Sequence, residues 1–286
     1  MIFRRPDATL FVPDGLPEAE ALARVTHLGI GAHQDDLEFM AIHGIAACYG
    51  SATRWFGGVT CTDGAGSARS GAYAALDDRA MRELRRREQH LAASVGQYGV
   101  MVQLGHPSAT VQDPDDPSLH TDLAGLLQHI KPRFVYTHNL ADKHATHVAV
   151  AVAAVRALRL LPPEARPEAV YGCEVWRSLD WMLDADKVAQ DVSRAGDLAA
   201  ALHEVFDSQT AGGKRYDTAV LGRRLANATF LDPRTVDQAQ SLALAMDLTP
   251  LVRDATLDLA AYVNGFIERF RADVQGRLRA CLHGAK

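Results

Sequence analysis

Short apolar runs alternate with helix-patterned segments along the first 160 residues. Runs typical of buried strands occur at residues 25–31, 54–62, 100–104, 133–138 and 169–176. Apolar residues recur with helical spacing at residues 37–49, 75–96, 123–131 and 147–161. Strands that alternate with helices predict right-handed βαβ units. We therefore expect an α/β, Rossmann-like, mostly parallel sheet flanked by helices.

The pattern is less regular after about residue 165, where we expect a mixed or helical C-terminal extension. We expect residues 1–165 to form the Rossmann-like core, and residues 166–286 to pack on it and complete a substrate cleft, in one compact domain. Helices are expected at residues 194–206, 234–247 and about 250–283. The apolar stripe of the last helix is expected to pack on its own domain, with a homo-oligomer interface as the alternative.

Composition and charge narrow the class of protein. The net charge is −5 and the pI about 6.2, so we expect no nucleic-acid partner. No apolar stretch is long enough for a membrane span, and the N-terminus lacks the apolar core of a secretory signal. The four cysteines form no C-x-x-C pair. These features predict a cytoplasmic protein with reduced thiols and no membrane partner.

The motifs give little support to a nucleotide-binding enzyme or to a serine hydrolase. The loop D-G-A-G-S-A-R-S-G at residues 63–71 lacks both the P-loop lysine and the G-x-G-x-x-G spacing. No G-x-S-x-G occurs, so a serine hydrolase of the α/β type is not indicated.

Polar residues follow three of the predicted strands. His33, Asp35 and Asp36 come after the first strand, and Asp63 comes after the second. The strand at 133–138 ends in a group of histidines and an acid: His138, Asp142, His144 and His147. Ligands in parallel α/β sheets gather beyond the carboxyl ends of the strands. We therefore expect these segments to meet at one edge.

Residue types and spacing suggest a metal site at that edge. His33 with Asp36, and His144 with His147, are each three residues apart, and such pairs share one helical face. His33, Asp36 and His147 would supply the two imidazoles and one carboxylate of a catalytic zinc site. Asp35 would then lie beside the metal as a general base. The alternative is that the histidines are ordinary hydrogen-bonded residues and the aspartates cap a helix.

The sequence A-H-Q-D-D-L-E at residues 32–38, together with K-H-A-T-H at residues 143–147, resembles the PIG-L/LmbE-like zinc deacetylases. The signatures of that family are A-H-P-D-D and a later H-x-D-H. Further segments are similar to it, and the resemblance covers about residues 25–155: V-T-C-T-D-G-A-G, L-R-R-R-E-Q-H-L-A-A and P-R-F-V-Y-T-H-N. The later A-L-H-E-V-F-D-S-Q-T is similar in a less specific way.

The resemblance implies an enzyme that removes the acetyl group from an N-acetylated amino sugar or N-acetylglucosamine conjugate, using water activated by Zn²⁺ or by Fe²⁺ in its place. It implies that His33, Asp36 and His147 bind the metal. It makes Asp35 the general base, and it makes His144 the group that stabilises the oxyanion. Either Asp35 or His144 returns a proton to the leaving amine. Two alternatives stay open: an amidase for a larger amide of a glucosamine-containing thiol conjugate, and a non-catalytic sugar-binding protein.

Three positions depart from the family pattern. Gln34 replaces the proline, and the acid after the aspartate pair is shifted by one place to Glu38. Thr146 replaces the aspartate of H-x-D-H, which is expected to orient a neighbouring histidine. Asp142 is the candidate to take over that task.

Other polar residues are candidates for the substrate cleft. We expect Arg85, Asp63 and Asp142 to contact the substrate. The alternative for Arg85 is a solvated salt pair with Glu88, and the alternative for Asp63 is a turn cap. Several more candidates each have a structural alternative, as core, surface or hydrogen-bonded residues: His43, His106, His138, Trp176, Trp181, Arg223 and Arg224.

Overall fold

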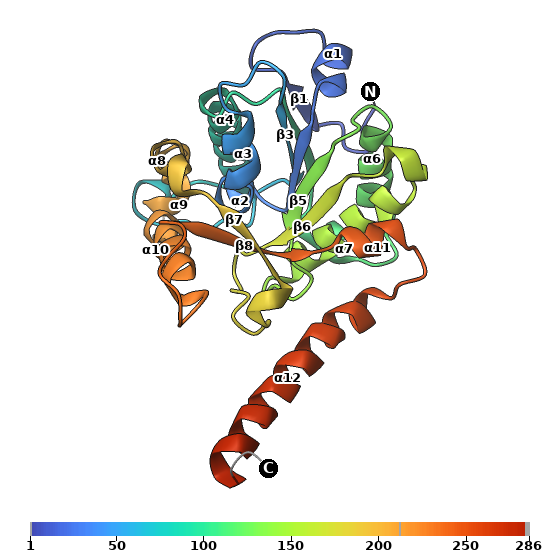
Figure 1. The fold of residues 1–286 in the computed structure, drawn as a ribbon. Helices are drawn as coiled ribbons and strands as arrows, with labels where there is room; N and C mark the ends of the chain where they lie inside the picture. Colours follow the sequence, from blue (N-terminus) through green and yellow to red (C-terminus); the bar gives the residue numbers. More distant parts are fainter. Residues whose placement is uncertain (1, 212, 284–286) are drawn as a thin grey trace.

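One eight-stranded sheet organises the chain in the computed structural model, which describes residues 2–211 and 213–283. Its strand order is β1-β4-β3-β2-β5-β6-β8-β7 (Figure 1). The strands are β1 (Thr9–Phe11), β2 (His27–Gly31), β3 (Phe56–Thr62), β4 (Val100–His106), β5 (Phe134–His138), β6 (Ala169–Cys173), β7 (Lys187–Asp191) and β8 (Leu242–Asp247). The five strands from β4 to β6 are parallel, whereas β1 and β8 run antiparallel to their neighbours. The predicted α/β fold is confirmed.

Twelve α-helices connect or follow the strands in the part of the chain that is described. They are α1 (Glu18–Ala23), α2 (Asp36–Met40), α3 (Ile42–Cys48), α4 (Asp78–Val95), α5 (Ser108–Gln112), α6 (Ser118–Leu127), α7 (Ala145–Arg159), α8 (Gly196–Glu204), α9 (Asp207–Thr210), α10 (Tyr216–Phe230), α11 (Thr249–Arg253) and α12 (Leu259–His283). Within the described ranges, no helix has both the length and the apolar character needed to cross a bilayer.

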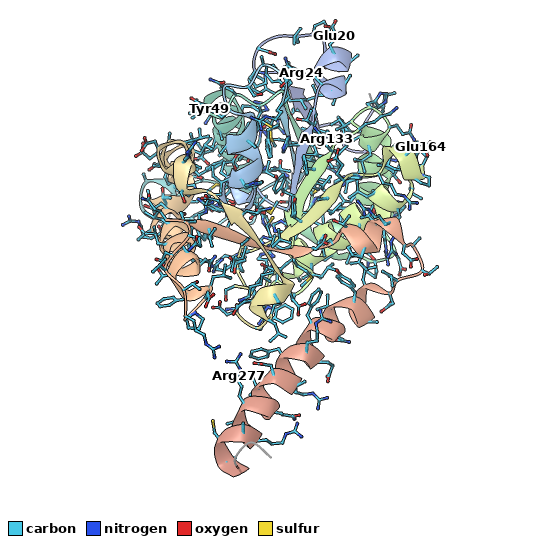
Figure 2. All side chains as sticks on the ribbon, viewed as in Figure 1. Glu20, Arg24, Tyr49, Arg133, Glu164 and Arg277 are labelled. Carbon is cyan, nitrogen blue, oxygen red and sulfur yellow. The ribbon has the colours of Figure 1, made fainter. Side chains whose placement is uncertain are left out.

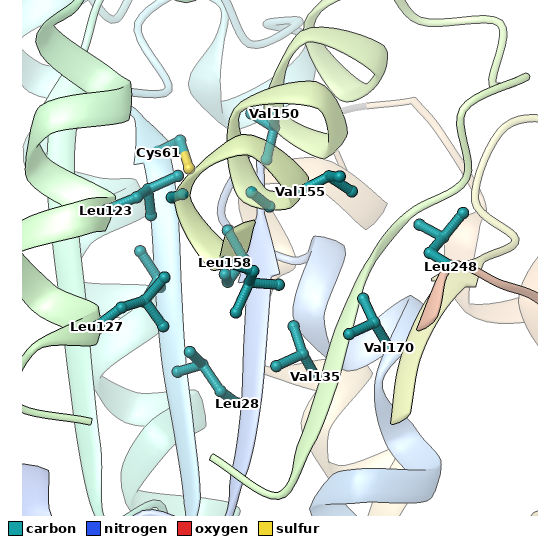
Figure 3. Close-up of a cluster of buried hydrophobic side chains, with 14 of the residues drawn as sticks. Leu28, Cys61, Leu123, Leu127, Val135, Val150, Val155, Leu158, Val170 and Leu248 are labelled. Carbon is teal, nitrogen blue, oxygen red and sulfur yellow. The ribbon is translucent and has the colours of Figure 1, made fainter. Parts of the chain in front are cut away.

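The helices cover both faces of the sheet. Alternate side chains of the central strands point to opposite faces, so Val135 of β5 belongs to one buried cluster and Tyr136 to the other. Helices α6, α7 and α11 pack on the first face, where Leu123, Val155 and Leu158 lie among the side chains drawn in Figure 3. Helices α2, α3, α4 and α8 pack on the second face. The central strands are therefore buried on both sides, as parallel strands usually are.

The C-terminal part of the chain extends the same sheet, and here one of our expectations is wrong. Residues 234–247 do not form a helix, because Leu242–Asp247 is strand β8, paired between β6 and β7. Alanine, leucine and methionine favour helices, but tertiary pairing overrides a local preference of this size. The longest helix that the sequence failed to reveal is α10, at residues 216–230.

Two predicted helices are each divided. The helix expected at 37–49 is interrupted at Ala41, whose φ of −106° and ψ of 17° separate α2 from α3. The helix expected at about 250–283 is α11 followed by α12, with a turn between them.

Helix α12 packs on the body only through its beginning. Phe266 is buried there, and the Tyr262 hydroxyl donates a hydrogen bond to the Asp247 carbonyl at 2.6 Å. Beyond this the helix projects from the body, and Figure 2 shows the Arg277 side chain standing clear of it. The apolar stripe continues on the projecting part, where Leu278 is 55% exposed. Packing on its own domain therefore accounts for only the first part of the stripe.

A close approach between α3 and β5 holds the second helical layer near the sheet. Gly44 of α3 faces Tyr136, and a Cβ at this glycine would lie 2.5 Å from the Tyr136 Cε2 atom. Tyr136 is fully buried, and its hydroxyl lies 2.9 Å from His43 Nδ1. The ring has little freedom to move away, so only glycine fits at this point of the helix.

We expect Gly44→Ala to lower the free energy of unfolding by about 1–3 kcal/mol, because the added methyl group overpacks the contact with Tyr136. Intrinsic helix propensity alone would predict a gain of about 1 kcal/mol. Urea denaturation followed by circular dichroism measures the difference. Gly125→Ala in α6 is the control, because its Cβ would meet no atom within 4 Å. Equal stability of the two variants would contradict the packing argument.

Candidate metal centre

The candidate site lies where the order of the sheet reverses. Strands β2 and β5 are neighbours, yet they belong to the two halves of the parallel sheet. The loops that leave such a pair turn to opposite faces, and this opens a crevice at their carboxyl ends. His33, Asp35 and Asp36 follow β2, and His144 and His147 follow β5. The expected meeting of the two segments is therefore observed.

His33, Asp36 and His147 bring three potential ligand atoms together. His33 Nδ1 lies 3.2 Å from His147 Nε2 and 3.3 Å from Asp36 Oδ2. The third side of the triangle, from His147 Nε2 to Asp36 Oδ2, measures 3.5 Å. Zinc bonds of about 2.0–2.1 Å in a tetrahedron separate neighbouring ligand atoms by about 3.3–3.4 Å. The triangle therefore has the size that a tetrahedral ion requires.

His138 and His144 also lie close to these atoms. Two groups of potential ligands overlap at His147: His33, His144 and His147, and Asp36, His138 and His147. His138 Nε2 accepts a hydrogen bond from the Ala32 N–H at 2.9 Å. That contact uses the lone pair that a metal would need. Burial, the largest influence, lowers the pKa of His138 to about 4, so the ring is neutral.

Asp142 supports the ring of His147. Its Oδ1 lies 3.4 Å from His147 Nδ1 and accepts a hydrogen bond from the His144 N–H. Its Oδ2 accepts from the N–H groups of Trp176 and Arg177. Burial opposes ionisation, but these hydrogen bonds and His147 outweigh it and lower the pKa of Asp142 to about 2. Its contacts fit a positioning role better than the substrate contact that we expected, and the histidine ring beside its carboxylate is that of His147.

Asp35 has an unusual backbone conformation. Its φ is 93°, in the left-handed region that L-residues rarely adopt. The Asp35 N–H donates to Gln89 Oε1, and Gln89 Nε2 donates to the buried Glu38. The Asp35 carboxylate lies 3.3 Å from Arg85 Nη2. Burial, opposed by Arg85, raises the pKa of Asp35 to about 8.

Gln89 and Glu38 are supporting residues whose roles the sequence analysis missed. Tyr98 donates a second hydrogen bond to Glu38, at 2.7 Å. A usable signal was present, because Gln89 lies one helical turn after Arg85 on the buried face of α4.

Arg85 and Asp63 differ in their relation to the cleft. Arg85 is only 2% exposed and also donates to the Gln34 carbonyl, so the solvated salt pair with Glu88 is wrong. Glu88 instead accepts hydrogen bonds from Ser208. Asp63 accepts a hydrogen bond from the Ala65 N–H and lies 3.3 Å from Arg82. These contacts correspond to the alternative in which Asp63 caps a turn.

The cleft above these residues has a volume of about 530 Å³. Three aromatic residues of the lining form one wall: Phe39, Trp176 and Tyr216. The rings of Trp176 and Tyr216 are nearly perpendicular, with centroids 5.8 Å apart. Other parts of the cleft are lined by the loop at residues 64–68. Four charged or polar side chains complete the lining: Arg85, His144, Thr146 and Arg223. Tyr216 belongs to α10, which the sequence did not reveal.

The remaining candidates lie outside the cleft lining. His106 is fully buried and lies 2.9 Å from Asp122. Trp181 packs against the core, and Arg224 is buried instead of forming a surface pair.

Comparison with solved structures identifies the fold. The conserved protein TT1542 from Thermus thermophilus is 19% identical, with a TM-score of 0.60 over 81% of this chain and 98% of that one. N,N'-diacetylchitobiose deacetylase from Pyrococcus horikoshii is 14% identical, with a TM-score of 0.58 over 78% and 84%. The 4-carboxy-2-hydroxymuconate hydratase GalB from Pseudomonas putida is 16% identical, with a TM-score of 0.56 over 79% and 96%. At this identity the similarity concerns the fold alone.

Comparison of sequences adds the family. No curated protein matches the chain. The family model described as PIG-L, GlcNAc-PI de-N-acetylase, matches residues 28–158, a range that contains His33, Asp35, Asp36, His144 and His147. Residues 28–158 of this chain therefore match the PIG-L family, on an α/β fold that the chain shares with a solved deacetylase.

Proposed function

We propose that the protein is a metal-dependent hydrolase that removes the acetyl group from an N-acetylated amino sugar or its conjugate. The observation that carries the proposal is the triangle of His33 Nδ1, Asp36 Oδ2 and His147 Nε2, with sides of 3.2–3.5 Å. The PIG-L match over the same residues supports amide hydrolysis as the reaction. The fold alone would not decide the reaction, because it also carries a hydratase.

His33, Asp36 and His147 would hold the ion. Burial would keep the Asp36 carboxyl neutral, but the neighbouring imidazole of His147 holds its pKa well below its usual range. An ionised carboxylate and two imidazoles suit Zn²⁺ and are also acceptable to Fe²⁺. A divalent ion held there would supply Lewis-acid chemistry, which polarises a carbonyl group and makes water more acidic.

Asp35 and His144 supply the remaining groups. Asp35 lines the cleft beside Asp36, and Arg85 holds its carboxylate at 3.3 Å. Burial alone would leave Asp35 protonated, but beside a bound divalent cation the ionised form would be favoured, and in this proposal it accepts the proton of the attacking water. The ring of His144 lies 5.0 Å from that of His33 and faces the same cleft, where it can donate to the oxyanion that forms. The leaving amine receives its proton from one of these two groups.

The cleft supports a sugar conjugate as the substrate. The apolar face of a pyranose ring stacks on aromatic side chains, and Phe39, Trp176 and Tyr216 provide such a wall. A cleft of about 530 Å³ is in the size range of sites for drug-sized ligands, which exceed one amino sugar. We therefore propose an N-acetylglucosamine unit that carries a further group.

Acetate release tests the reaction. We expect the purified protein to release acetate from N-acetylglucosamine conjugates and to act at least about tenfold more slowly on matched bulky N-acyl analogues. Enzymatic assay of acetate, with mass spectrometry of the amine product, measures both. Faster cleavage of the bulky amide would favour an amidase. Saturable sugar binding without acetate release from the metal-loaded protein would favour a binding protein.

We expect about one divalent ion per chain, and we expect His33→Ala and His147→Ala to lose it. Asp142→Asn should weaken metal affinity by about 10- to 100-fold, because the carboxylate orients the His147 ring. Elemental analysis and titration with a competing chelator measure these effects. His129→Ala, at an exposed histidine, is the control and should bind metal normally. Equal metal content in all four variants would contradict the assignment.

Asp35→Asn should retain the metal but lower kcat by about 100- to 10,000-fold, because the amide cannot accept the proton of water. Asp63→Asn is the matched control, because Asp63 caps the neighbouring loop without lining the cleft, and its kcat should change little. Steady-state kinetics and elemental analysis on the same samples give both readouts. Loss of metal from Asp35→Asn would show that Asp35 is itself a ligand.

A further inference from the structure

A second cavity lies on the other side of α10 from the cleft. Its volume is about 280 Å³. Helix α10 contributes Tyr216, Val220 and Arg223 to the cleft. The same helix contributes Leu221 and Arg224 to the second cavity, where α8 forms the opposite wall. The two hollows therefore share a helix but not its lining residues.

Most of the wall of this cavity is apolar. The apolar lining residues come from the start of α8, the segment before it, and α10: Val192, Ala195, Ala199, Ala200 and Leu221. An apolar cavity of about 150 Å³ is enough to bind benzene. A cavity of about 280 Å³ therefore has room for an aliphatic chain of several carbons.

Arg224 places a buried positive charge in this apolar cavity. Its side chain is 5% exposed, and its Nη2 donates to the carbonyl groups of Glu38 and Phe39. Among the described residues, none accepts a hydrogen bond from its Nε or Nη1, and no carboxylate forms an ion pair with it. Burial lowers the pKa of Arg224 only to about 10, so the group stays charged at neutral pH.

The acidic residues of the lining do not neutralise this charge. Asp217 accepts two hydrogen bonds from Arg215, at 3.0 and 2.9 Å. Glu204 is exposed to solvent and forms no ion pair with a described residue. The two carbonyl groups satisfy one nitrogen of the guanidinium but supply no negative charge, and buried guanidinium groups normally face a carboxylate or phosphate.

We propose that the second cavity binds a short aliphatic carboxylate, with its carboxylate on Arg224 and its chain between α8 and α10. A carboxylate accepts the free guanidinium N–H groups, and the chain removes apolar wall from water. Inorganic phosphate would satisfy the charge but would leave the apolar wall unfilled. The site is separate from the proposed chemistry, so its occupancy can be measured without turnover.

Occupancy would reach the metal centre through α2. Arg224 holds the carbonyl groups at the end of this five-residue helix, and Asp36 lies at its beginning. His203, also in the lining, lies 3.4 Å from the Glu38 carbonyl through its Nε2. A ligand that fixes Arg224 is therefore expected to stabilise α2 and to raise the melting temperature.

Isothermal titration calorimetry of the purified protein with octanoate tests the proposal. We expect saturable binding of one octanoate per chain, at least about tenfold tighter than octan-1-ol, because only octanoate offers a charged acceptor to Arg224. Acetate, which lacks the chain, should bind at least about tenfold more weakly than octanoate. Octan-1-ol binding as tightly as octanoate, or no saturable binding of octanoate, would overturn the proposal.

Two tryptophan variants of α10 locate the site. Leu221 lines the cavity and is 52% exposed, so Leu221→Trp should fill the cavity without disturbing the core. Leu225→Trp is the matched control, because Leu225 is 48% exposed and is not part of the lining. We expect Leu221→Trp to weaken octanoate binding at least about tenfold and Leu225→Trp to leave it unchanged. Binding that survives Leu221→Trp would place octanoate elsewhere, for example at the metal centre, and would overturn the assignment.

Arg224→Met removes the charge itself and should reduce octanoate affinity to that of octan-1-ol. Circular dichroism and the melting temperature establish whether this variant is folded. If it is not folded, the comparison of Leu221→Trp with Leu225→Trp still decides the question.

Discussion

The parallel pairing of β2 with β5 is the constraint on which the site depends. His27 to Ile30 pair in register with Phe134 to Thr137, so both strands end at the same level of the sheet. Backbone hydrogen bonds thereby bring His33 and His147, 114 residues apart, to 3.2 Å. The fully buried Thr137 adds a side-chain hydrogen bond to the Ile30 carbonyl across this pair. A shift of one residue in this register would turn each side chain to the opposite face of the sheet.

Buried polar contacts convert this coarse placement into a defined geometry. Asp142 joins the loop after β5 to the segment that carries Trp176, and Gln89 joins α4 to the backbone of Asp35. Arg224 and His203, from the last third of the chain, contact carbonyl groups of α2. Each contact links segments distant in sequence, so the C-terminal part of the chain contributes to the precision of the centre as well as to the cleft wall.

The sequence predicted the central parallel strands and the convergence of His33, Asp36 and His147, because both follow from local patterns and a general rule for parallel sheets. It failed at β8, where pairing with β6 and β7 decides the conformation of a segment rich in alanine and leucine. It also failed at α10, whose two faces line the cleft and the second cavity only once the tertiary structure has formed. The burial of Arg85 and Arg224 was equally hidden, because a charged residue in a helical pattern ordinarily faces solvent.

The left-handed backbone at Asp35 sets the protein's stability against the chemistry that we propose for it. An aspartate at this position has a φ of 93° that glycine would adopt without strain, and such strain costs on the order of 1–3 kcal/mol. Glycine, which would adopt this conformation without strain, lacks the carboxylate that faces Arg85. Glycine here would relieve this strain but would remove both the partner of the buried Arg85 and the general base that we propose, so a search for heat resistance alone is a poor guide to improvement at this one turn.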